Sequence, residues 1–356
     1  MIPMKPMPSP LSPELQAALA RVLGRRADHG LAAPDLDRIV DLLGEVPPER
    51  ITTADAAIAY AAGLHREPPP SRWRWFGKPR TDAELLAQSP DLALLFLFHR
   101  DGRMREAALA RLSGGLPSPF LFAAVAWRLN DWSAPVRTAA VACARRCFPL
   151  TPPEVVARCA AALHLQRLGW SRWSGERAVL DEAFGRPDVA ARLADLLIGQ
   201  MTGPVARVLR AVSRTPALDP YLLRVAAEAV QPAARAAALS LLVEGKASWP
   251  VGRDWQWVDK SIGRRRLVFV YDVRPLTVAP GLDTVIAQSI ADRSAAVRRV
   301  ALEGAMYRLK GRPEARTYAT RLLGDRSPSV RERAEFILRT DTGEASRAPE
   351  SEGGRG

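Results

Sequence analysis

A ten-residue pattern that occurs three times in this 356-residue chain constrains its fold more than any other feature. The pattern is Asp, four residues, an aliphatic residue, Arg, two residues and Ala. Its copies stand in NDWSAPVRTAA, DRSAAVRRVA and DRSPSVRERA, and looser copies surround Met104-Arg105 and Ala234-Arg235. The aliphatic residues lie at 104, 136, 234, 297 and 330, so the steps are 32, 98, 63 and 33 residues. A period of about 33 residues with helical patterns on both sides predicts stacked helix pairs.

The pattern has a physical meaning on a helix. Its Asp favours a tight turn, Ser133 and Ser327 are placed to cap the helix, and Pro328 suits the first helical position. The aliphatic residue and the Ala one turn later share a face, which lets a neighbouring helix approach closely. The Arg points off that face and can reach a carbonyl or carboxylate of the neighbouring repeat. We therefore expect structural roles for Asp101, Arg105, Asp131, Arg137, Arg235, Asp292, Arg298, Asp325 and Arg331.

The pattern resembles HEAT repeats, especially the short bacterial kind found in phycobilisome-lyase-like proteins. The resemblance covers residues 98–145 and 282–340, whereas HRDGRMREAA departs from it because Asp101 stands only three residues before Met104. It implies an all-α fold, an α-solenoid of stacked helical hairpins. HEAT arrays are generally protein-interaction scaffolds, and some bind nucleic acid.

Composition divides the rest of the chain around this array. We expect a flexible N-terminus at 1–12, a helical cap with a Pro/Trp-rich break at 13–80, and HEAT-like repeats at 81–245. A Trp/Arg-rich insertion with β character follows at 246–280, then further repeats at 281–340. The polar, Gly-rich residues 341–356 predict a disordered tail.

The net charge of +13 favours nucleic acid as a partner. However, nearly all of the 51 basic residues are Arg, and the chain is rich in Ala, Pro and Gly, a bias that a GC-rich genome produces regardless of function. No apolar run approaches the roughly 18 residues of a membrane-spanning helix. The N-terminal MIPMKPMPSPLSP lacks the apolar segment of a signal peptide. We therefore expect a cytoplasmic protein with no membrane partner, of unknown oligomeric state.

Residues that commonly carry chemistry are sparse. Cys143, Cys147 and Cys159 have no neighbouring His in sequence and are expected in the core rather than in a disulfide framework or metal site. The four His residues each stand alone in sequence, and no nucleotide-binding or serine-nucleophile pattern is found. The sequence thus predicts neither a cofactor nor a metal, and no enzyme activity.

The segment GKASWPVGRDWQWVDKSIGRRRLVFVYDVRP (Gly245–Pro275) interrupts the repeats and contains a predicted strand, RLVFVYDV. Its Trp residues either cover gaps between repeats or, together with Arg, form an anion- or base-binding surface. Its strand could also pair with a partner chain. The candidate binding residues are Trp73 and Trp75 from the Pro-rich break, with Trp249, Arg253, Trp255, Trp257, Arg264, Arg265 and Arg266.

We accordingly expect a non-enzymatic scaffold that binds a protein partner through its solenoid groove and this insertion, with nucleic acid as the alternative partner. A less favoured alternative is an alkylpurine DNA glycosylase of the HEAT-like class, which uses Trp and Asp near the damaged base. Trp127 and Asp131 are four residues apart and are therefore predicted to share a helical face, with Trp132 adjacent. That family would call for a W-D-x-V-D stretch, whereas this chain has NDWSAPV.

Overall fold

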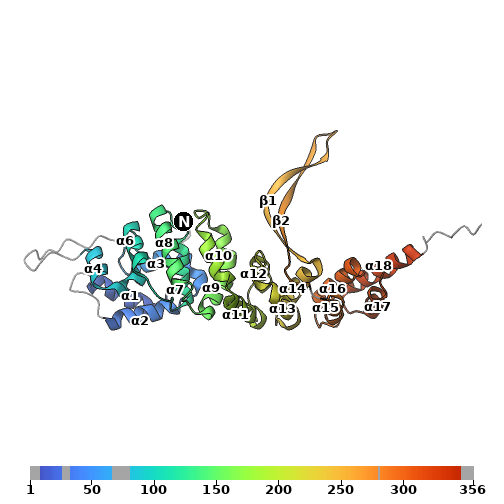
Figure 1. The fold of residues 1–356 in the computed structure, drawn as a ribbon, viewed down its shortest axis with the longest axis horizontal. Helices are drawn as coiled ribbons and strands as arrows, with labels where there is room; N and C mark the ends of the chain where they lie inside the picture. The colour runs from blue at the N-terminus through green and yellow to red at the C-terminus, as the bar shows by residue number, and fades with distance from the viewer. Residues whose placement is uncertain (1–8, 26–32, 66–80, 280, 346–356) are drawn as a thin grey trace, which may run out of the picture. The chain divides into compact units, whose positions relative to one another are not determined.

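A computed structural model describes residues 9–25, 33–65, 81–279 and 281–345. These residues form eighteen α-helices, four short 3-10 helices and one antiparallel pair of strands (Figure 1). The prediction of a predominantly helical chain is confirmed. Among the described helices, none is long and apolar enough to cross a membrane. The chain divides into two compact units, Met1–Leu193 and Ala194–Gly356.

The first unit packs its helices around α7. The helices are α1 (Pro13–Arg25), α2 (Ala33–Gly44), α3 (Ile51–Ala61), α4 (Asp82–Gln88), α5 (Ala93–Phe96), α6 (Gly102–Arg111), α7 (Pro119–Arg128), α8 (Ala134–Cys147), α9 (Pro153–Gln166), α10 (Arg177–Gly185) and the start of α11 (Pro187–Gly199), with 3-10 turns at Pro48–Arg50, Pro90–Leu92 and Arg167–Gly169. Phe122 of α7 is fully buried and stacks on Phe148 at 4.0 Å between ring centroids. Helix α7 is buried at most of its positions because α2, α3, α8 and α9 all contact it.

The three cysteines belong to this core. Cys143, Cys147 and Cys159 are free thiols with no exposed surface, which confirms their prediction as core residues. Burial raises the pKa of the Cys159 thiol. A buried neutral thiol is a poor nucleophile, so Cys159 serves packing.

The second unit repeats one arrangement of helix pairs. Its helices are α12 (Val205–Val212), α13 (Leu222–Glu228), α14 (Pro232–Glu244), α15 (Leu282–Ile290), α16 (Ala295–Arg308), α17 (Pro313–Leu322) and α18 (Pro328–Ala345), with a 3-10 turn, η4, at Pro216–Tyr221. Helices α14, α16 and α18 carry the repeated pattern. Helix α16 packs on both α14 and α18, and each of the three also packs on the helix that precedes it in sequence, which is α13, α15 and α17 in turn. Helix α18 ends at Ala345, beyond the expected start of the tail at residue 341.

Close approach of α14 and α16 depends on Gly304. A Cβ atom at this position would lie 2.8 Å from Cγ2 of Val243 and 3.3 Å from Cδ1 of Ile286. No real Cβ tolerates the first of these distances, so the contact between the two helices requires glycine here.

The helices that carry the pattern begin with the predicted Asp turn, but the predicted capping bond of Ser133 is absent. Ser133 occupies the N-cap position of α8, but its hydroxyl accepts no capping hydrogen bond. Instead, Oδ1 of Asp131 accepts a hydrogen bond from the Ser133 N–H at 3.0 Å. Asp292 and Asp325 accept the same bond from the N–H two residues later, at 2.7 and 2.8 Å. The Asp side chain therefore shapes the turn before each of these helices, and at α8 and α16 the Ser hydroxyl makes no capping bond.

The insertion folds as two long antiparallel strands, β1 (Lys246–Asp259) and β2 (Arg264–Pro275), which we call the ribbon (Figure 1). The turn between them ends at Gly263, whose positive φ of 68° favours glycine. The predicted strand lies within β2, whereas the sequence did not reveal β1. Bulges near Val251 and Val258 break the alternation of β1 and obscure it in the sequence.

Candidate functional site

The arginines of the repeated pattern bond inside the fold. Each donates Nη1 to the carbonyl oxygen six residues earlier: Arg105 to His99, Arg137 to Asp131, Arg235 to Ala229, Arg298 to Asp292 and Arg331 to Asp325. These bonds tie the helix to its own preceding turn.

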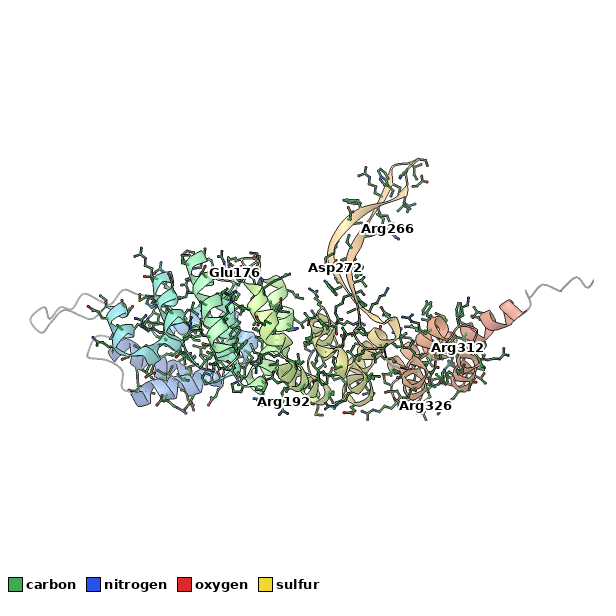
Figure 2. The ribbon with its side chains drawn as sticks, in the orientation of Figure 1. Glu176, Arg192, Arg266, Asp272, Arg312 and Arg326 are labelled. Carbon is green, nitrogen blue, oxygen red and sulfur yellow. The ribbon has the colours of Figure 1, made fainter. Side chains whose placement is uncertain are left out.

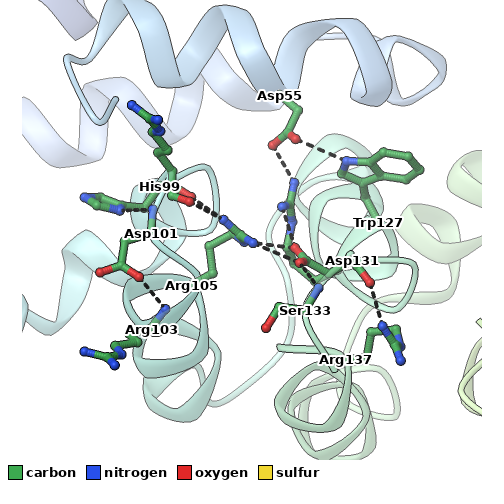
Figure 3. Close-up of polar contacts among 11 residues, drawn as sticks. Asp55, His99, Asp101, Arg103, Arg105, Trp127, Asp131, Ser133 and Arg137 are labelled. Atoms are coloured by element: carbon green, nitrogen blue, oxygen red, sulfur yellow. Dashed lines mark hydrogen bonds and ion pairs between the residues drawn. The ribbon is translucent and has the colours of Figure 1, made fainter. Parts of the chain in front are cut away.

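In four of these arginines, all except Arg331, the other guanidinium nitrogens bond a carboxylate farther along the chain, and we call these contacts the arginine ladder. Arg105 bonds both oxygens of Asp131 at 2.8 and 2.9 Å (Figure 3). In the same way Arg235 bonds those of Asp292, and Arg298 those of Asp325, at 2.7–2.9 Å. Arg137 instead meets Glu176 at 2.9 Å. Side chains so engaged are not available to a partner, so the charge of these four arginines is structural.

Asp131 is the most enclosed carboxylate of the arginine ladder. It accepts hydrogen bonds from Arg105, Arg128 and the Ser133 N–H, and its side chain is 1% exposed. Burial by itself raises the pKa of the Asp131 carboxyl, but the hydrogen bonds from Arg105 and Ser133 and the charge of Arg128 outweigh it. The pKa therefore lies below its ordinary value, and Asp131 stays ionised at neutral pH.

A cavity of about 430 Å³ opens beside Asp131. Its lining includes Asp55, Tyr60, Trp127, Asp131, Trp132 and Arg172. Asp55 accepts hydrogen bonds from Nε1 of Trp127 and from Arg128, which also bonds Asp131 (Figure 3). Both carboxylates of this cavity are thus held by arginine.

The ribbon has two chemically different faces. In an antiparallel pair, residues directly opposite each other project to the same side, and side chains alternate along each strand. The register pairs Trp257 with Arg265, Trp255 with Leu267, and Arg253 with Phe269. One side, which we call the aromatic face, therefore carries Lys246, Arg253, Trp255, Trp257, Arg265, Leu267, Phe269, Tyr271 and Val273.

The opposite side, the polar face, carries the carboxylates of the paired strands. Its residues include Trp249, Asp254, Gln256, Asp259, Arg264, Arg266, Val268, Val270, Asp272 and Arg274. Figure 2 labels two of them, Arg266 toward the turn and Asp272 nearer the helices. The triple arginine is therefore split, because Arg265 lies on the aromatic face and its two neighbours on the polar face.

The aromatic face is open to solvent. Trp255 is 60% exposed, Phe269 52% and Tyr271 55%, although the apolar face of an antiparallel sheet is ordinarily covered by a core. The Arg265 guanidinium lies 3.9 Å from the centre of the Trp257 ring, and that of Arg253 lies 4.7 Å from Phe269. These cation–π contacts order the face without covering it.

The base of the ribbon is fixed to the helical unit through Arg274. Its guanidinium bonds both oxygens of Asp219 at 2.7 and 2.9 Å and the carbonyl oxygens of Ser213 and Thr215 at 2.8 and 2.7 Å. Burial raises the pKa of the fully enclosed Asp219, but the bonds and charge of Arg274 and the bonds from Thr277 outweigh it, so the pKa is lowered. Sequence reasoning missed this pair, because 55 residues separate its members and no pattern links them.

The structure separates the candidate binding residues. Arg253, Trp255, Trp257 and Arg265 come together on the aromatic face. Trp249 lies at the base of the ribbon, 5.8 Å from the guanidinium of Arg214, where it serves packing. The other candidates from the ribbon, Arg264 and Arg266, are exposed on the polar face. Trp73 and Trp75 lie outside the described residues.

Comparisons with family models, curated proteins and solved structures gave no match to this chain. The resemblance to HEAT repeats therefore rests on the repeated pattern itself.

Proposed function

We propose that this chain is a non-enzymatic scaffold of HEAT-like helical hairpins, stacked as an α-solenoid within each compact unit, that binds a macromolecular partner. Two features support the scaffold. The helices that carry the pattern pack on one another in order along α14, α16 and α18. The arginine ladder joins successive repeats by one recurring contact, which is the nearest-neighbour coupling that repeat proteins use.

The exposed aromatic face is the observation that carries the binding function. Trp, Tyr and Arg are the residue types that contribute most at binding interfaces, and Trp255, Tyr271 and Arg253 are gathered on this face. A two-stranded ribbon with an uncovered apolar side is marginal in water by itself. A partner that covers this side removes apolar area from water at about 25 cal/mol per Å².

The test compares the two faces of the ribbon. Changing Trp255, Phe269 and Tyr271 to Ser alters only the aromatic face, whereas Gln256→Ser with Val270→Ser alters the polar face as a matched control. Material captured from a cell extract, protein and nucleic acid alike, should be lost with the first variant and retained with the second. Far-UV circular dichroism should show the same helix content in all three proteins. Equal capture by both variants would remove the aromatic face as the interface.

A DNA glycosylase is a second candidate, and the cavity is the observation that favours it. Trp127, Asp131 and Trp132 line one cavity, and a carboxylate beside aromatic rings can stabilise a developing cationic sugar. However, Asp131 is committed to Arg105 and Arg128, which leaves it little capacity to meet a second cation. Release of methylated purines from alkylated DNA by the purified protein tests this activity directly, and absence of release eliminates it.

A further inference from the structure

We propose that the aromatic face binds single-stranded nucleic acid, with bases stacked on its rings and phosphates placed against its cations. This inference rests on the proposed function, because it names the partner of the same face. It is carried by how charge is divided between the two sides of the ribbon and by the exposed rings that follow one another on one side.

Charge is divided unequally between the faces. Lys246, Arg253 and Arg265 lie on the aromatic face, and among the paired residues of β1 and β2 that face carries no carboxylate. The three carboxylates of the paired residues, Asp254, Asp259 and Asp272, all lie on the polar face. A chain of phosphates is repelled by any carboxylate along its path, so this separation suits a polyanion.

The rings form a layer that suits unpaired bases. Trp255, Trp257, Phe269 and Tyr271 follow one another on the same side of two adjacent strands, and the Phe269 and Tyr271 centroids are 6.3 Å apart. Arg265 and Arg253 lie over two of these rings. Bases of single strands stack on aromatic rings and on guanidinium planes, each stack contributing about 1–3 kcal/mol.

Other occupants suit this face less well. A duplex keeps its base faces stacked internally, so the rings would have no surface to stack on. A second copy placed face to face would bring the Arg253 and Arg265 cations of the two chains together with no carboxylate between them. A protein partner would have to be acidic as well as apolar, and oligonucleotide binding distinguishes a nucleic-acid partner from such a protein.

The experiment measures fluorescence anisotropy of labelled single-stranded and duplex oligonucleotides of one sequence, titrated with the full chain at several salt concentrations. Single strands should bind more tightly than duplex. If all three cations of the face meet phosphates, log K should fall with log salt with a slope of about −2, at about 0.7 per phosphate. Changing Arg253 and Arg265 to Ser should make this slope shallower.

Ring variants test the stacking. Trp255→Ser with Phe269→Ser should weaken single-strand binding by roughly tenfold or more, whereas Trp255→Tyr with Phe269→Tyr should retain it. The polar-face control Gln256→Ser with Val270→Ser should bind as the unchanged chain does.

Each other outcome overturns the inference. If duplex binds as tightly as single strands, or if the ring variants bind as the unchanged chain does, binding depends on positive charge in general and not on stacking. If no oligonucleotide binds but the aromatic-face variant still loses captured protein, the nucleic-acid inference fails and the proposed binding function stands. If neither capture nor oligonucleotide binding depends on this face, both fail.

Discussion

At the residue scale, three arginines of the pattern make two kinds of contact, one with their own turn and one with the Asp of the next copy of the pattern: Arg105, Arg235 and Arg298. Arg298 bonds the carbonyl of Asp292 and both oxygens of Asp325. The spacing of the pattern predicts that such an Arg reaches a neighbouring repeat. It does not identify Glu176 as the partner of Arg137, since Glu176 belongs to no copy of the pattern.

Removing a carboxylate of the arginine ladder should be costly. Asp325→Ala leaves the largely buried Arg298 without its counter-ion, which should lower the free energy of unfolding by about 3–5 kcal/mol. Asp283→Ala is the control, because Asp283 and its partner Arg312 are both more than half exposed. Its loss should be a small fraction of the first. Urea unfolding followed by circular dichroism measures both, and similar losses would contradict a structural role for the arginine ladder.

The carboxylates that bond arginine also determine how the stability of the fold depends on pH. The pKa values of Asp131, Asp219, Asp292 and Asp325 are lowered in the folded chain, and that of Glu176 falls to about 2. A lowered pKa stabilises the fold above the unfolded values of about 3.9 for Asp and 4.3 for Glu, and this stabilisation is lost as pH falls toward the folded values. The urea midpoint should therefore change little between pH 7 and pH 5 on account of these groups and fall steeply below about pH 4. A main loss centred near pH 6 would implicate other groups.

At the element scale, the helices were easier to predict than the ribbon. The pattern marks α8, α16 and α18 because capping positions and apolar spacing recur there. Strand β2 shows an uninterrupted run of strand-forming residues, but Pro250, Gly252 and two bulges hide β1. The two faces of the ribbon follow from the register, which sequence alone did not supply.

The anchor of the ribbon can be tested separately from its faces. Arg274→Ala leaves the fully enclosed carboxylate of Asp219 without its ion pair, so amide hydrogen exchange should accelerate at the base of both strands and in η4. Arg266→Ala, on the same strand and exposed, should leave exchange at these amides unchanged. Equal exchange in the two variants would show that the base is held by other contacts.

The close contact between α14 and α16 makes a further prediction. Gly304→Val places side-chain atoms against Val243 and Ile286 and should destabilise the fold by about 1–3 kcal/mol. Gly324→Ala is the control, because a Cβ at Gly324 meets no atom within 4 Å. The midpoint of thermal unfolding measures the effect in both variants. An unchanged midpoint for Gly304→Val would mean that α14 and α16 can move apart without a loss of stability.

At the scale of the whole molecule, the net charge of +13 does not by itself mark a binding surface. Inside the structure, some arginines already have their charge balanced by an Asp, as in the Arg235–Asp292 and Arg274–Asp219 pairs. The arginines of the aromatic face instead lie over rings. Composition counts both kinds of Arg alike, so only the contacts distinguish the structural charge from the charge that a partner can use.

The most direct test of a partner on the aromatic face is ¹⁹F nuclear magnetic resonance of the chain labelled with 5-fluorotryptophan. Trp255→Phe and Trp257→Phe assign two of the nine Trp signals, and Trp170, which is 9% exposed, serves as a buried reference. Before binding, the Trp255 and Trp257 signals should shift when H2O is replaced by D2O. A saturating single-stranded oligonucleotide should move both signals and reduce that solvent response, while the Trp170 signal stays in place. Two signals insensitive to solvent from the start, or unchanged at saturation, would contradict the account.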